Sequence, residues 1–219
     1  MINAIKKTSL ISPPTDCISP IGEELLLKGL KKETNAEFYA STTRKPSVYR
    51  GNPFQIEVAI AYGGDLSPEG PVEIMRFANR VPLLYQKGAC AITETIKTMN
   101  WKPYGLQQSK GGLPQGPVII LVHIASVWTP FTSEAKEAIA HYPEIMDEIR
   151  LALQDVGRKL KIYVIRKQRA QHEMKKMNYI KKYIPHIAEA LRDILDLSDS
   201  QEERAEDALR EVLENERAE

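Results

Sequence analysis

The fold is decided by a loop that leads directly into an apolar run: QSKGGLPQGP at residues 108–117, then VIILV at residues 118–122. Glycine lets the backbone turn tightly and approach a ligand closely, while proline fixes φ and stiffens the loop. The hydrophobicity continues almost unbroken over residues 117–127, which predicts a central strand buried on both faces. Lys110 therefore lies on a stiff loop at the mouth of that strand, where its ammonium group is either solvated or a sensor for a phosphate.

The residues before this loop predict two further strands. Residues 54–62 alternate with period two, which indicates a strand with one buried face, and the alternation places Glu57 among the outward-facing residues. A second strand is expected at residues 72–77. Residues 34–52 are polar and are expected to form a loop.

Three short helices are also expected. Ser19 is the expected N-cap of the first, with Pro20 at the first helical position and acidic residues in the first turn. Apolar residues at helical spacing predict the second helix at 89–99. Ser133 is expected to cap the third helix, which would extend to Ala140.

From Pro143 onward, apolar residues recur at steps of three and four. This pattern predicts one long amphipathic helix, or two stacked end to end, with a kink or a break at Pro185. The roughly 40 residues before Pro185 would span about 60 Å as a helix. Because a domain of this size needs no such helix for its own core, the length favours a lever or a stalk for docking a partner.

Composition limits the class of protein. The chain has 219 residues, 42% of them hydrophobic, and a formal net charge of +1, so its global field favours neither nucleic acid nor a membrane. Its two cysteines, Cys17 and Cys90, lack CxxC spacing, which indicates a reducing cytosol. No apolar run approaches the roughly 20 residues needed to span a bilayer, and no signal peptide is indicated.

Charge is distributed unevenly along the chain. Residues 150–182 are dominated by lysine and arginine, with Asp155 and Glu173 as the only acids there. The balance inverts after Glu189, and residues 198–219 form an acidic tail that is either a marginal helix or disordered. The basic rod leaves open a role in binding nucleic acid.

Sequence motifs for catalysis are missing. The chain has no GxxxxGK[ST], GxSxG, HExxH or CxxC pair. His123 lies inside the predicted central strand, where a satisfied core residue is expected rather than a base. We therefore expect no catalytic residues and no metal ligands.

Several segments together resemble the B subunit of archaeal DNA topoisomerase VI, a type IIB topoisomerase. They are TRKPSVYRGNPF (43–54), EVAIAYGG (57–64), RFANRVPLLY (76–85) and SKGGLP (109–114), with PPTDCISPIGEE (13–24) upstream. They occur in the family's order and spacing, and the resemblance extends from about residue 10 to about residue 195.

The resemblance implies a transducer domain of the α+β class. Its small, mainly four-stranded sheet would be backed by helices, with a left-handed βαβ crossover as in ribosomal-protein-like domains, and a long C-terminal helix would follow. Lys110 matches the lysine that reaches the γ-phosphate of bound ATP, and the neighbouring Gln108 would also face the nucleotide. The long helix matches the element that docks on the A subunit, which cleaves DNA.

The ATP-binding domain of the family is missing from this sequence. Its acidic residue and asparagine on one helix, its aspartate before a glycine pair and its glycine-rich lid are not found. The chain thus resembles the C-terminal portion of the B subunit, inactive by itself. ATP and Mg²⁺ would be held mainly by a partner domain.

The expected layout has four parts. A connecting segment with a short helix covers residues 1–50, the transducer sheet 51–142, the helical stalk 143–197 and the acidic tail 198–219. The expected partners are the A subunit, the ATP-binding half of the B subunit and DNA, in the cytoplasm at the nucleoid and away from membranes. The alternative is a non-catalytic nucleic-acid-binding or adaptor module that uses the basic helical rod.

Overall fold

The computed structural model describes residues 15–215. The chain divides into two compact units, Met1–Val164 and Ile165–Glu219. The beginning of the expected connecting segment and the last four residues of the acidic tail lie outside the described residues. None of the described helices is both long enough and apolar enough to cross a membrane.

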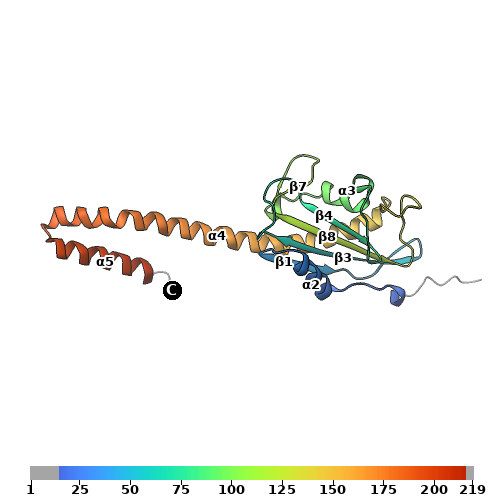
Figure 1. Cartoon of the computed structure of the whole chain (residues 1–219), viewed down its shortest axis with the longest axis horizontal. Coiled ribbons are helices and arrows are strands. Elements are labelled where there is room, and N and C mark those ends of the chain that lie inside the picture. Colours follow the sequence, from blue (N-terminus) through green and yellow to red (C-terminus); the bar gives the residue numbers. More distant parts are fainter. Residues whose placement is uncertain (1–14, 216–219) are drawn as a thin grey trace, which may run out of the picture. The chain divides into compact units, whose positions relative to one another are not determined.

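The first unit is built on a mixed sheet with the order β1-β3-β8-β4-β5 (Figure 1). Its four longer strands are β1 (Phe38–Thr43), β3 (Asn52–Tyr62), β8 (Val118–Ser126) and β4 (Glu73–Ala78). The short strands β5 (Val81–Pro82) and β2 (Ser47–Tyr49) pair with β4 and β3. This arrangement confirms the α+β class and a mainly four-stranded sheet.

Strand β8 is the centre of the sheet, as its continuous hydrophobicity predicts. All nine of its residues are buried, and it pairs antiparallel with β3 and parallel with β4. The connection from β4 to β8 contains helix α3 (Ala91–Thr98), so these elements form a βαβ unit. The handedness of that crossover stays a prediction.

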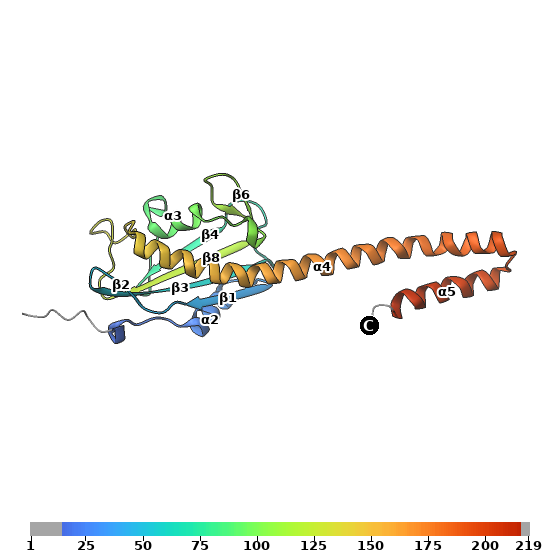
Figure 2. The same ribbon diagram turned by 180° about the vertical axis from the view of Figure 1, so that it is seen from behind.

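Helices cover both faces of the sheet, as the two opposite views show (Figures 1 and 2). On one face, α3 and the beginning of α4 (Pro143–Leu195) form the larger hydrophobic core, in which Ile149, Leu153 and Val156 of α4 are fully buried. On the other face, α2 (Glu23–Glu33) buries Leu26 and Leu30 against alanines of β3 and apolar residues of β8. The long C-terminal helix expected from the sequence is thus confirmed.

The expectation of a loop over residues 34–52 is wrong. Strands β1 and β2 lie within it and pair antiparallel with β3, with Thr42 opposite Val58 and Val48 opposite Pro53. Local pattern does not reveal these strands, because polar residues such as Ser41 and Thr42 are buried by pairing and not by hydrophobicity. The part of the chain before residue 51 therefore contributes strands to the sheet.

One expected helix start and one expected helix are also wrong. Helix α2 begins at Glu23 after Gly22, because the carboxylate of Glu57, from β3, accepts hydrogen bonds from the backbone N–H groups of Ile21 and Gly22. A tertiary contact thus replaces the cap expected from Ser19. The segment after Ser133 is not helical; Phe131 and Ile139 form a β-bridge there instead.

Helix α4 continues through Pro185 without a break. A proline inside a helix removes one backbone hydrogen bond. Its neighbours Ile184 and Ala188 are buried within the second unit, and this apolar burial offsets the loss. The expectation of a break at this position is therefore wrong.

The second unit consists of residues 165–195 of α4 followed by α5 (Asp199–Asn215). Helix α5 is formed by the acidic residues after the basic rod. At its N-terminus, Gln201 Oε1 accepts a hydrogen bond from the backbone N–H of Ser198 at 2.9 Å, and the Ser198 carbonyl accepts one from the backbone N–H of Glu202 at 3.0 Å. The first of these is the contact by which a side chain three residues into a helix reaches back to the N-cap in a capping box. Residues of the tail itself, Ser198 and Gln201, therefore fix where α5 begins.

Gly64 is required where β3 ends. Its φ is +65°, and a Cβ atom there would lie 2.3 Å from the carbonyl oxygen of Asn35 and 2.8 Å from Cα of Ala36. We expect Gly64→Ala to lower the free energy of unfolding by roughly 2 to 4 kcal/mol, because backbone atoms must shift. Denaturant titration of the purified chain measures this loss.

The matched control is Gly70→Ala. Gly70 also has a positive φ, +95°, but a Cβ atom there would meet nothing within 4 Å. Gly70→Ala should lower the free energy of unfolding only by the backbone strain, about 1 to 2 kcal/mol. Equal losses for the two variants would show that the close approach at Gly64 is unimportant.

Candidate functional site

Lys110 lies at the exposed tip of a small hairpin. Strands β6 (Gln107–Gln108) and β7 (Pro114–Gln115) pair antiparallel, and the loop between them is closed by a hydrogen bond of 3.0 Å from Gly112 N–H to the Ser109 carbonyl. Gly111 has a φ of +70°, which glycine adopts without strain. The hairpin therefore presents the ammonium group of Lys110 outward on a defined turn.

The side chain of Gln108 braces this hairpin. Its Oε1 accepts a hydrogen bond from the backbone N–H of Trp101 at 3.0 Å. Its Nε2 donates to the carbonyls of Lys97 at 3.0 Å and Gly112 at 2.9 Å. Because the amide makes these three contacts within the chain, Gln108 links the end of α3, the turn that carries Lys110 and the loop at residues 99–106, called the Trp101 loop below.

A surface depression of about 660 Å³ lies beside the hairpin and is bordered by Lys110. Lys97 and Lys102 also line it, and Glu94 is its one carboxylate. Three ammonium groups against one carboxylate make the depression a positively charged site suited to an anion. Of these three lysines, the sequence points only to Lys110, because Lys97 and Lys102 reach the site through the fold of α3 and the Trp101 loop.

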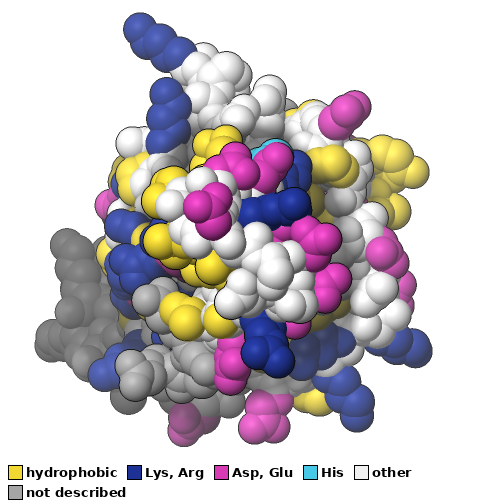
Figure 3. Space-filling model, turned by 90° about the vertical axis from the view of Figure 1, so that its left-hand side faces the viewer, with side chains coloured by type: hydrophobic (Ala, Val, Ile, Leu, Met, Phe, Trp, Pro, Cys, Tyr) yellow, Lys and Arg dark blue, Asp and Glu magenta, His cyan; other side chains and the backbone are white. Residues whose placement is uncertain are grey.

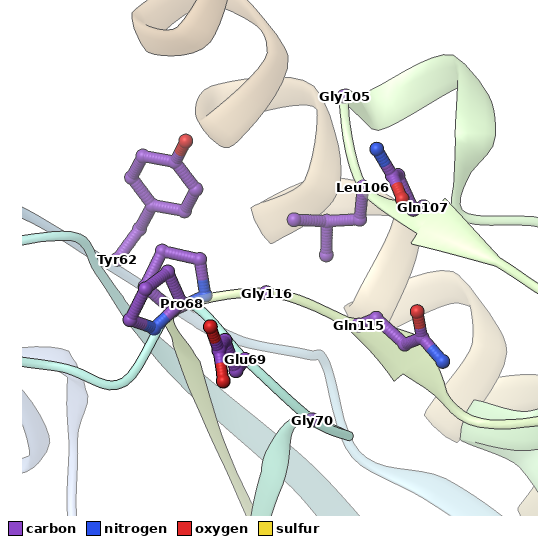
Figure 4. Close-up of a pocket in the computed structure, with 10 residues that line it drawn as sticks. Tyr62, Pro68, Glu69, Gly70, Gly105, Leu106, Gln107, Gln115 and Gly116 are labelled. Carbon is purple, nitrogen blue, oxygen red and sulfur yellow. The ribbon is translucent and has the colours of Figure 1, made fainter.

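A second depression, of about 440 Å³, lies at the base of the same hairpin (Figure 4). Gln107 and Gln115, a cross-strand pair, line it together with Tyr62 and Glu69. Its ten lining residues include no lysine, arginine or histidine. The charge distribution therefore favours the lysine-lined depression as the anion site.

The hairpin is connected to helix α4 through aromatic residues. Trp101 is fully buried, and its indole N–H donates to the carbonyl of Ile96 at 2.8 Å. The neighbouring Tyr104 packs so closely on α4 that a Cβ atom on Gly157 would lie 3.0 Å from its ring. Residues 101–104 therefore lie between the hairpin that carries Lys110 and α4.

A buried acid–histidine pair lies in the sheet at Glu57 and His123. Both side chains are fully buried, with His123 Nδ1 2.8 Å from Glu57 Oε2. His123 Nε2 accepts a hydrogen bond of 3.0 Å from the backbone N–H of Arg80. Because Nε2 is an acceptor, Nδ1 carries the ring hydrogen and donates a hydrogen bond to Glu57. The prediction that His123 is a satisfied core residue is confirmed, whereas the outward position expected for Glu57 is wrong.

The pKa of Glu57 is set by two opposing effects. Burial raises the pKa of this carboxyl, but hydrogen bonds from His123, Ile21, Gly22 and Thr43 outweigh burial and lower it below its usual value. Every partner thus favours the ionised form. The pair stabilises the fold and has no exposed atom to offer a ligand. Among residues 15–215, no three or more histidine, cysteine or acidic side chains converge as a metal site.

Fold and site together define a class of protein: an α+β module that presents a charged hairpin and braces it on a long helix. The sequence model of the family described as "Topoisomerase VI B subunit, transducer" matches residues 13–176. The chain is 54% identical over 196 residues to the B subunit of type 2 DNA topoisomerase 6 from Methanococcoides burtonii, covering 90% of this chain and 32% of that protein. The protein with the same description from Natronomonas pharaonis is 47% identical over 216 residues, covering 98% of this chain and 27% of that protein.

The chain belongs to the topoisomerase VI B subunit transducer family. It spans about a third of the length of the curated relatives it matches. Among solved structures, "Crystal structure of B-subunit of the DNA gyrase from Myxococcus xanthus" aligns with a TM-score of 0.36 and 18% identity, covering 55% of this chain and 34% of that chain.

Proposed function

We propose that this chain is the transducer of a DNA topoisomerase VI B subunit. It senses ATP held by a partner domain through Lys110 and relays that state along α4 to the A subunit, which cleaves DNA and is called the cleavage subunit below. The observation that carries the proposal is the exposed Lys110 on a hairpin braced against α4, in a chain of this family. The relay serves ATP-dependent passage of one DNA duplex through another.

The residues around Lys110 fit the terminal phosphate of a nucleotide. Lys110 is exposed, and Lys97 and Lys102 border the same depression. A lysine ammonium group is a mobile point charge that suits a phosphate. The described residues supply no cluster of acids for Mg²⁺, so the metal ion and most contacts to the nucleotide would come from the partner domain.

The relay works through a contact that exists in one nucleotide state only. Lys110 gains a charge-assisted hydrogen bond when a terminal phosphate lies opposite the hairpin, and it loses this bond when the phosphate is cleaved. Gln108 holds the hairpin to the Trp101 loop, and Tyr104 of that loop packs on Gly157 of α4. The position of Lys110 can therefore bias that of α4, which is how a local contact shifts a two-state equilibrium.

The long helix α4 would supply the contact with the cleavage subunit. The main alternative is a nucleic-acid-binding or adaptor module, because residues 166–182 carry seven basic residues and one acid. On the face that Figure 3 shows, side chains of both charges are interspersed with hydrophobic ones, without a continuous basic patch. The proposed role places the protein in the cytoplasm, at the nucleoid.

Partner choice tests this function. The purified chain should form a complex with the cleavage subunit that survives an increase from about 50 to 200 mM salt, whereas binding to duplex DNA alone should fall by orders of magnitude over that range, as phosphate contacts do. Both affinities can be measured by fluorescence anisotropy. Tight, salt-resistant binding to DNA without affinity for the cleavage subunit would instead support the nucleic-acid-binding module.

A further inference from the structure

Helix α5 folds back on the last turns of α4 within the second unit. The guanidinium of Arg192 on α4 contacts Glu202 Oε2 at 2.8 Å and Asp199 Oδ1 at 3.1 Å. The hydrogen bond from Ser198 N–H to Gln201 fixes where α5 begins. The reversal of the chain between the two helices is therefore supported at the turn by hydrogen bonds and ion pairs.

Apolar residues hold the two helices together beyond the turn. On α5, Ala205, Leu209 and Leu213 recur every four residues and are at least partly buried, whereas Val212 is 60% exposed. On α4, Ile184 is 3% and Ala188 0% exposed. Helix α5 thus turns one apolar stripe toward α4 and leaves its other face to solvent.

The charges of the two helices are complementary. Helix α5 carries seven acidic and two basic residues, a formal charge of −5. Residues 166–182 of α4 carry seven basic residues and one acidic residue, a formal charge of +6. Opposite charges therefore attract α5 to residues 166–182 of α4.

Helix α5 covers the apolar surface of α4 only in part toward its own C-terminal end. Leu213 lines a groove of about 540 Å³ together with Met174, Met177 and Ile180 of α4. Met174 in this groove is 65% exposed, so α5 leaves part of the apolar surface of α4 open to solvent. Arg192 is about half exposed, so its ion pairs contribute little in water. Partial cover and exposed ion pairs both limit the free energy that holds α5 on α4.

We propose that α5 is an intramolecular cap: it covers a face of α4 that docks the cleavage subunit, and it must swing away before docking. The inference rests on the proposed function, in which α4 binds that subunit. The family match ends at residue 176, before α5, so the family model assigns this helix no role. A closed cap lowers the apparent affinity by the fraction of molecules that are open.

The test uses the full chain with Leu213→Lys, which places a positive charge in the apolar stripe, beside Lys176 and Lys181 of α4. If the cap is closed about nine-tenths of the time, this variant should bind the cleavage subunit roughly tenfold more tightly than the unmodified chain. Val212→Lys is the matched control, because the neighbouring position faces solvent. It should leave the affinity unchanged.

A second measurement reports the cap without any partner. In a Cys17→Ser background, Ala188→Cys places a thiol at a position that is fully buried in the second unit. Leu213→Lys should make this thiol react several-fold faster with a soluble reagent, and Val212→Lys should not. An unchanged labelling rate would show that α5 does not cover this face.

The two proposals fail in different ways. If the Leu213→Lys and Val212→Lys variants bind the cleavage subunit equally tightly, the cap is contradicted while docking through α4 stands. If neither variant nor the unmodified chain binds that subunit, docking itself is contradicted and the cap has nothing to shield. Tighter binding by Leu213→Lys alone, together with faster labelling, supports the cap.

Discussion

Replacing Lys110 with alanine is expected to lower ATP-dependent strand passage by roughly 10- to 100-fold in a complex reconstituted with the ATP-binding part of the B subunit and the cleavage subunit. A hydrogen bond to a charged group contributes about 1.5 to 3 kcal/mol, and each 1.4 kcal/mol corresponds to a factor of about ten. Relaxation of supercoiled DNA, followed over time at saturating ATP, measures the effect.

The fold should tolerate this substitution. Lys110 is exposed at the tip of the hairpin, and Gln108 and Gly111 determine the turn. The variant should therefore unfold at the same denaturant concentration as the unmodified chain. Lys28→Ala is the matched control, since Lys28 is also an exposed lysine but lies on α2, on the other face of the sheet. Relaxation at the normal rate by Lys110→Ala would remove the sensor role.

Most of the sheet could be predicted from local pattern. The apolar run of β8 follows directly from burial, and α4 follows from its apolar stripe. The alternation in β3 reveals the strand, but its expected single buried face is wrong, because α2 covers the second face as well. Strand β1 could not be found this way. Its buried serine and threonine become strand residues only through pairing with β3, a contact that no local window contains.

Only the part of the candidate site that depends on local sequence could be predicted. The glycines around Lys110 mark a turn, and a turn at the start of a strand presents its side chain outward. The positions of Lys97 and Lys102 depend on how α3 and the Trp101 loop fold back beside the hairpin. Nothing in the spacing of these lysines along the chain encodes that proximity.

Glu57 shows how tertiary structure can override a sound pattern. Its place in the alternation of β3 predicts exposure, yet it is buried on the face where α2 begins. Four donors surround its carboxylate: the N–H groups of Ile21 and Gly22, the hydroxyl of Thr43 and the ring of His123. A buried charge persists when hydrogen bonds replace its hydration.

Glu57→Gln is expected to lower the free energy of unfolding by about 3 to 5 kcal/mol at neutral pH. The amide has nearly the shape of the carboxylate, but its NH₂ group would face donors where an oxygen now accepts. Two of the four donors would then be buried without a partner, and His123 would lose its charged neighbour. Denaturant titration measures the loss, with Glu134→Gln, at an exposed loop position, as the matched control.

The same carboxylate makes stability depend on pH in a direction that can be checked. Because the pKa of Glu57 is lowered by folding, its contribution is fully present above the unfolded pKa, near 4.5, and is lost as the pH falls through the lower folded value. The unmodified chain should therefore lose stability more steeply in acid than Glu57→Gln, which has no such group to protonate. Parallel curves of stability against pH for the two proteins would mean that Glu57 is not held ionised. The hydrogen bonds that it accepts from Ile21 and Gly22 at the start of α2 would then need another explanation.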